Sequence, residues 1–109
     1  MSAIRYQLCP ACGDRWALPR SRCRSCGGQP ETRDSAGRGT VFSVTTQRRA
    51  PSRDFPVAPP WRIGLVDLDE GPRVMGILDE DARIGSRVVG EMQDFAGAQV
   101  ATFRTKQEE

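Results

Sequence analysis

The pattern of apolar and polar positions changes near residue 38. Before that point apolar side chains are sparse, and after it short apolar runs alternate with turns rich in Gly, Pro and Asp. Runs of β-branched and aromatic residues bounded by such turns are typical of β-strands. The pattern predicts five strands, over residues 40–47, 61–69, 73–78, 87–92 and 99–104.

The connections between these strands favour one architecture. Glu70-Gly71-Pro72 predicts a hairpin between the second and third strands, and Ala96-Gly97 predicts a turn before the last. Residues 79–82 are expected to form one helical turn, and residues 106–109 a charged, frayed tail. Five short strands in this order are typical of a small Greek-key barrel of the OB type, and the glycines inside them suit tight coiling.

Residues 1–37 carry a different signal. All four cysteines fall in two CxxC pairs, Cys9-Pro-Ala-Cys12-Gly and Cys23-Arg-Ser-Cys26-Gly. Four thiolates in a tetrahedron suit Zn²⁺ and leave no position open for water or substrate, so we expect Cys9, Cys12, Cys23 and Cys26 to hold a structural zinc ion. Because this segment has few apolar side chains, the metal must supply its folding free energy.

These signals together predict a mainly β protein. A rubredoxin-like zinc ribbon over residues 1–37 is followed by a five-stranded OB-fold barrel over residues 38–109. Two other interpretations of the cysteines remain open. Two disulfides would use the same residues, although nothing at the N-terminus resembles a secretion signal and cytosolic thiols stay reduced. Iron would take the same four ligands. With no apolar run of the ~20 residues that a membrane span needs, we expect a cytoplasmic protein.

The net charge of +2 conceals an asymmetry. Residues 1–66 contain eleven Arg and four acidic residues, whereas residues 67–109 contain five basic and ten acidic residues. A basic first half could face phosphate, in nucleic acid or in a nucleotide-like cofactor, or its arginines could simply be solvated. The chain has no His, and the metal uses every Cys, which excludes Ser-His and Cys-His dyads. We expect the acidic clusters at 67–70 and 79–81 to be solvated turns, and we do not expect an independent enzyme.

Several segments together resemble a known family. They are the two CxxCG pairs, Gly37-Arg38-Gly39-Thr40-Val41-Phe42-Ser43, the proline-rich loop ending in Pro59-Pro60-Trp61, and Leu65-Val66-Asp67-Leu68-Asp69-Glu70-Gly71-Pro72-Arg73-Val74. In this combination the chain resembles the zinc-ribbon OB-fold proteins of the DUF35 family along essentially its whole length. The resemblance implies a non-catalytic accessory subunit of a hetero-oligomer. Its partner would be a thiolase-like enzyme (an acyltransferase, thiolase or retro-aldolase) acting on acyl-CoA, whose assembly and CoA channel the subunit would support.

The resemblance gives the long loop over residues 50–60 a candidate role, since loops of this length in small domains are usually functional. We expect its apolar residues to anchor the partner enzyme; these are Phe55, Val57, Pro59, Pro60 and Trp61. Alternatively, Phe55 and Trp61 fold back to cap the barrel end. Arg48, Arg49 and Arg53 are candidates for contact with a CoA phosphate or an acidic patch of the partner, with solvent exposure as the alternative.

The main rival is a nucleic-acid-binding protein, because zinc ribbons and OB-folds both serve that function. An OB binding face usually carries aromatic side chains that stack on bases. Along the predicted strands only Phe42 and Phe103 are aromatic, with Trp61 at a strand start, and the second half of the chain is acidic. The aromatic content therefore favours the companion-subunit hypothesis over nucleic-acid binding.

Overall fold

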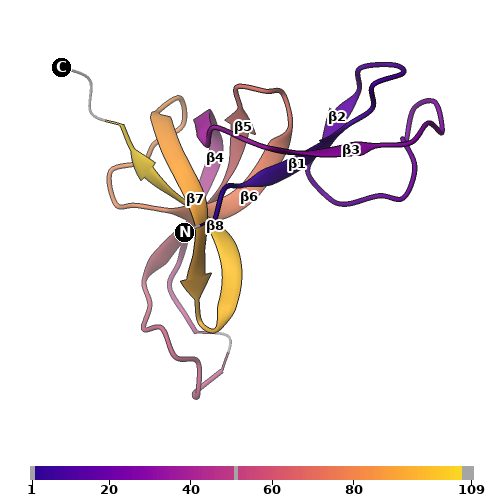
Figure 1. Cartoon of the computed structure of the whole chain (residues 1–109). Helices are drawn as coiled ribbons and strands as arrows, with labels where there is room; N and C mark the ends of the chain where they lie inside the picture. The colour runs from indigo at the N-terminus through magenta and orange to yellow at the C-terminus, as the bar shows by residue number, and fades with distance from the viewer. Residues whose placement is uncertain (1, 51, 107–109) are drawn as a thin grey trace.

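Eight β-strands make up the regular structure of this chain in a computed structural model that describes residues 2–50 and 52–106. Three form a small N-terminal sheet: β1 (Arg5–Leu8), β2 (Arg15–Trp16) and β3 (Glu31–Asp34). Five form a barrel: β4 (Arg38–Gln47), β5 (Trp61–Leu68), β6 (Arg73–Leu78), β7 (Arg87–Phe95) and β8 (Ala98–Thr105). Figure 1 shows the N-terminal sheet projecting from one side of the barrel.

The barrel is closed, in the strand order β4-β5-β6-β8-β7, and is an OB-fold. All five predicted strands are confirmed, although β4 begins two residues earlier than predicted and β7 continues to Phe95. The helical turn predicted at residues 79–82 is wrong, because this segment forms only a turn in which the Ala82 N–H faces the Asp79 carbonyl at 3.5 Å. The described residues contain no helix long and apolar enough to cross a membrane. Pro51 and the predicted tail at 107–109 lie outside the described part.

The barrel core is formed by inward-facing aliphatic side chains around the ring of Phe103, which is 1% exposed. That ring lies between Gly76 and Gly90. A Cβ on Gly76 would lie 2.8 Å from the Phe103 Cε2 atom, and one on Gly90 would clash with the ring's other edge. The two glycines are therefore required by the close approach of an aromatic ring.

The N-terminal segment takes part in the barrel. Ile4 is 3% exposed and belongs to the barrel core, together with Val41 and Phe103. Its carbonyl accepts a hydrogen bond from the Ser35 N–H at 2.7 Å, and the Met92 N–H on β7 donates to the Ser2 carbonyl at 2.7 Å. The residues before β1 therefore pack against the barrel, and the cysteine-bearing sheet begins after them.

Glu70, in the turn between β5 and β6, joins the barrel to the N-terminal sheet. One carboxylate oxygen accepts the Ser35 hydroxyl and the other accepts the Ala36 N–H, each at 2.9 Å. The Glu70 carbonyl accepts a hydrogen bond from the Arg15 guanidinium at 2.6 Å. This carboxylate was expected to be solvated, but in the structure it fixes the segment that links β3 to β4.

Replacing Glu70 with alanine is expected to loosen this joint. Both side-chain hydrogen bonds are lost, which should lower the free energy of unfolding by about 1–3 kcal/mol. Urea denaturation would measure the change, and hydrogen exchange should speed up at Ala36 and its neighbours. Glu80→Ala is the matched control, because the Glu80 side chain is exposed and far from the joint. Equal stability of the two variants would contradict the assigned role.

Candidate metal centre and binding surfaces

The four cysteines lie in two loops of the N-terminal sheet, at its end away from the barrel (Figure 1). All four sulfur atoms lie within 4.8 Å of one another. The Cys9–Cys26 and Cys12–Cys23 sulfur pairs are both 3.5 Å apart, and no disulfide joins them in the described chain. Four sulfurs at about 2.3 Å from a zinc ion would be about 3.8 Å apart, so the cluster could bind a metal ion.

The two cysteine loops have the same backbone geometry. In the first, the Gly13 N–H donates to the Cys9 carbonyl at 2.7 Å, and in the second the Gly27 N–H donates to the Cys23 carbonyl at 3.0 Å. Gly13 and Gly27 have φ angles of 81° and 76°, in the left-handed region that favours glycine. The glycine that follows each CxxC pair therefore makes the turn that brings both its cysteines to one point.

Hydrogen bonds within the cluster shift the pKa values of Cys12 and Cys23 in opposite directions. Burial acts to raise the pKa of Cys23, but backbone N–H groups of Cys26 and Ser25 aimed at its sulfur outweigh it and lower the pKa to about 6. A backbone hydrogen bond at Asp14 acts to lower the pKa of Cys12, yet hydrogen bonds with the neighbouring thiols raise it to about 12. A divalent metal ion bound at the four sulfurs would stabilise their thiolate forms.

The Asp14 side chain connects the two cysteine loops by hydrogen bonds. Its carboxylate accepts hydrogen bonds from the Arg24 Nε at 2.9 Å and from the Ser25 hydroxyl at 2.8 Å. The Arg24 hydrogen bonds, followed by the one from Ser25, hold the pKa of Asp14 well below its ordinary value. Trp16 packs under the cluster against Cys9 and Cys23. The sequence motif contains no signal for Asp14 beyond its position directly after the first CxxCG.

The proline-rich loop is pinned to the barrel by an aromatic cluster. Phe55 stacks on Trp61 with ring centres 5.3 Å apart, and Trp61 meets Phe95 edge-on at 5.6 Å. All three rings are half-buried, as is Val57, whereas Pro59 and Pro60 are exposed. Phe55 and Trp61 therefore do fold back onto the barrel end, and they still present part of their surface. Figure 1 shows the loop and the β7–β8 hairpin at the same end of the barrel.

Sequence reasoning missed Phe95, the third member of this aromatic cluster. It lies at the end of β7, directly before the Ala96-Gly97 turn. In an OB-fold the loop between the first two strands and the loop between the last two flank the same face. That topological rule was the signal that could have paired Phe95 with Trp61.

Arg48, Arg49 and Arg53 are all exposed and flank the same loop. Within residues 2–50 and 52–106, the ion pairs and side-chain hydrogen bonds involve none of their guanidinium groups. Among the described residues, these three cations beside the loop therefore have no carboxylate partner.

The outer face of β5 and β6 is the face on which OB-folds bind oligonucleotides. Here the register places two aliphatic cross-strand pairs on it, Ile63 opposite Ile77 and Leu65 opposite Met75. Phe42 is 48% exposed, but the Arg73 guanidinium covers its ring at 3.5 Å from the centre. The middle of this face is therefore aliphatic, and the aromatic residue of these two strands is Trp61 at the start of β5, whose ring packs against Phe55 and Phe95.

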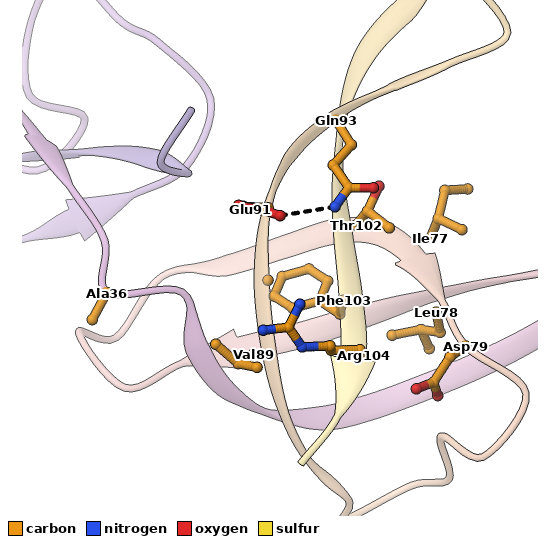
Figure 2. Close-up of a pocket in the computed structure, with 11 residues that line it drawn as sticks. Ala36, Ile77, Leu78, Asp79, Val89, Glu91, Gln93, Thr102, Phe103 and Arg104 are labelled. Atoms are coloured by element: carbon orange, nitrogen blue, oxygen red, sulfur yellow. Dashed lines mark hydrogen bonds between the residues drawn. The ribbon is translucent and has the colours of Figure 1, made fainter. Parts of the chain in front are cut away.

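A hollow of about 450 Å³, whose lining is drawn in Figure 2, lies over residues of β6, β7 and β8 and also contacts Ala36 and Asp79. Its acidic groups have structural partners. Asp79 accepts the Thr105 N–H at 2.6 Å and the Thr105 hydroxyl at 2.7 Å, and the Gln93 amide donates to Glu91 at 2.9 Å. Partial burial acts to raise the pKa of Asp79, but the Thr105 hydrogen bonds outweigh it and lower the pKa. The residues around this hollow form no arrangement of nucleophile and base.

Comparison with known proteins gives a consistent result. A family model described as the C-terminal OB-fold domain of ChsH2 matches residues 32–93. A DUF35 domain-containing scaffold protein of Methanocaldococcus jannaschii is 33% identical over 86 residues, covering 73% of this chain. The match spans 60% of that relative's length.

Two solved structures share the fold over nearly the whole chain. The structure described as an Ltp2-ChsH2(DUF35) aldolase is 28% identical, with a TM-score of 0.76, and the match covers 94% of this chain and 84% of that one. A DUF35-family protein of unknown function from Sulfolobus solfataricus is 17% identical, with a TM-score of 0.65 and coverage of 95% and 76%, and it supports the fold alone. This chain, with its four-cysteine sheet and OB-fold barrel, belongs to the DUF35 family.

Proposed function

We propose that this chain is a non-catalytic companion subunit of a thiolase-like enzyme. The partner is an acyltransferase, thiolase or retro-aldolase that acts on acyl-CoA, and this chain supports its assembly and borders its CoA channel. The observation that carries the proposal is the likeness, at TM-score 0.76, to a DUF35 chain of an aldolase whose description names two components, Ltp2 and ChsH2. The relative described as a scaffold protein supports the same function.

The chemistry of the described residues is consistent with a supporting role. On a tetrahedral ion the four clustered cysteines would fill every position, which leaves none for a substrate. The chain has no His, and the acidic groups Asp14, Glu70 and Asp79 are engaged in structural hydrogen bonds. In this proposal the metal is zinc with a structural role, and the protein is cytoplasmic, where thiols stay reduced.

The proline-rich loop supplies the proposed contact with the partner enzyme. Phe55, Val57 and Trp61 present half-buried apolar surface on a rigid support, with Pro59 and Pro60 exposed beside them. Aromatic groups in such positions are frequent hot spots of protein interfaces. The unpaired guanidinium groups of Arg48, Arg49 and Arg53 would meet an acidic patch of the partner or a phosphate of its CoA.

Co-expression with thiolase-like enzymes of the same genome tests the proposal. We expect this chain to elute with one of them as a stable complex in size-exclusion chromatography. Trp61→Ala should weaken the complex about 10–100-fold, since interface hot spots contribute about 2 kcal/mol or more. Ile84→Ser is the control, because Ile84 is 71% exposed and outside the loop. Failure of every such enzyme to bind the wild-type chain would refute the proposal.

A second candidate, nucleic-acid binding, is favoured by one observation. A recess of about 380 Å³ is lined by Arg15, Arg20, Arg24 and Arg73, with Asp67 as its only acidic residue among the described lining. Binding of a single-stranded oligonucleotide that weakens steeply as salt rises would support this candidate.

Iron in place of zinc would be visible as an absorption band of the purified protein.

A further inference from the structure

A second surface, lined by none of the residues of the proline-rich loop, has the features of a peptide-binding groove. It has a volume of about 880 Å³ and lies between the N-terminal segment, the ribbon residues 17–19 and the starts of β6 and β8. Most of its lining is apolar, and Leu18 and Met75 are 79% and 68% exposed. We call this surface the edge groove, defined by residues 2–5, 17–19, 65, 73–75, 92 and 99–101.

The groove runs along an open strand edge. β6 and β8 pair at two positions, Ile77 with Thr102 and Leu78 with Phe103. Within the described part of the chain, residues 73–75 of β6 therefore have no strand paired to them on this side. Val74 points into the barrel and is buried, whereas Met75 points outward, yet both line the groove. Because successive side chains of a strand point to opposite faces, a groove lined by both must follow the strand's edge.

An open edge offers backbone groups as well as apolar side chains. The backbone N–H and C=O groups directed away from β5 have no strand to pair with over residues 73–75. Such an edge can accept an additional strand, in which main-chain hydrogen bonds provide affinity and side-chain pockets provide specificity. The exposed Leu18 and Met75 would contact alternate side chains of that strand.

The charges around the groove specify the occupant further. The basic recess lined by Arg15 and Arg20 adjoins the groove and shares Ala17, Leu18 and Arg73 with it. Arg73 is neutralised by Asp67 at 2.6 Å, and Arg5 by Asp34 at 3.3 Å. Arg15 and Arg20 have no carboxylate partner among the described residues, so the end of the groove carries uncompensated positive charge. An occupant that is aliphatic and then acidic would complement it.

We propose that the edge groove binds an extended segment of the partner protein, aliphatic in the groove and acidic at the end next to Arg15 and Arg20, which adds as a strand to β6. This inference rests on the proposed function, because the occupant belongs to the companion enzyme. It assigns the contact to a surface other than the proline-rich loop, so the two can be tested separately.

The test uses the full chain co-expressed with the thiolase-like enzyme that co-elutes with it. Met75→Asp should weaken the complex at least 10-fold, since it places a carboxylate in the apolar groove, whereas Met75→Leu and Ile84→Asp should leave it unchanged. The double variant Arg15→Glu/Arg20→Glu should also weaken the complex, and by a larger factor at low salt than at high salt. In hydrogen exchange, the amides of residues 73–75 that are directed away from β5 should gain protection only in the wild-type complex. Circular dichroism should show that each variant is folded.

Each outcome decides between the two proposals. A complex that tolerates Met75→Asp and adds no protection to the amides of residues 73–75 overturns the edge-groove inference but leaves the companion-subunit function intact. Absence of any complex with the wild-type chain overturns both. A homodimer that Met75→Asp abolishes would show that the occupant is a second copy of this chain, and competition by a single-stranded oligonucleotide would show that it is nucleic acid; either result overturns the inference.

Discussion

Replacing Cys23 with serine is expected to abolish tight metal binding and to unfold the N-terminal sheet while the barrel stays folded. Structural zinc contributes on the order of 10 kcal/mol or more to the folding of small metal-bound units. The apolar packing around the cluster consists of Trp16 against two of the cysteines, Cys9 and Cys23, which cannot replace that contribution. Metal analysis should give less than one equivalent of tightly held zinc, and the NMR signals of residues 5–34 should collapse.

Ser21→Ala is the matched control for this variant. Ser21 is exposed and lies on the same loop, so its replacement should change neither the metal content nor the spectrum. Zinc content that is unchanged in Cys23→Ser would contradict the four-cysteine site. Unfolding of the whole chain would instead show that the barrel depends on the ribbon, through Ile4 and the Glu70 joint.

Replacing Phe103 with alanine is expected to be the most damaging single change in the barrel. The ring is 1% exposed and fills the space between Gly76 and Gly90, where the loss of a side chain leaves a cavity that the strands cannot close. Such substitutions typically cost about 3–5 kcal/mol. Because small domains have a free energy of unfolding of about 5–15 kcal/mol, urea denaturation should show a large fall in the midpoint or no folded protein.

Phe42→Ala provides the comparison within the same barrel. Phe42 is 48% exposed and contacts the Arg73 guanidinium, so its loss should cost about 1 kcal/mol. If both variants lose the same stability, the assignment of Phe103 to the centre of the core is wrong.

The strands and the four-cysteine cluster were predictable because their signals are local. Apolar runs between Gly and Pro turns predicted all five barrel strands, and the two CxxCG pairs predicted which sulfurs meet. The residue after each pair is a glycine, which readily adopts the left-handed conformation found at Gly13 and Gly27. In each case the residues that determine the structure lie within a few positions of one another.

What the sequence could not reveal depends on contacts between distant segments. Glu70 fixes the linker near Ser35, Ile4 enters the barrel core, and Phe95 closes on Trp61. No periodicity or local motif links the members of these pairs, and Phe95 could be paired with Trp61 only through the loop topology of an OB-fold. The open edge of β6 depends on the angle at which β6 and β8 diverge after two paired positions, which only the three-dimensional arrangement determines.

The turnover of the partner enzyme, measured with and without this chain, tests the central claim most directly. A thiolase-like enzyme that co-elutes with this chain would be purified alone and as the complex, then assayed on acyl-CoA substrates by the release or consumption of free CoA thiol. The companion-subunit account predicts at least a 10-fold higher turnover for the complex, restored when the purified chain is added back. Equal turnover in both preparations, with no effect on the enzyme's stability, would contradict it.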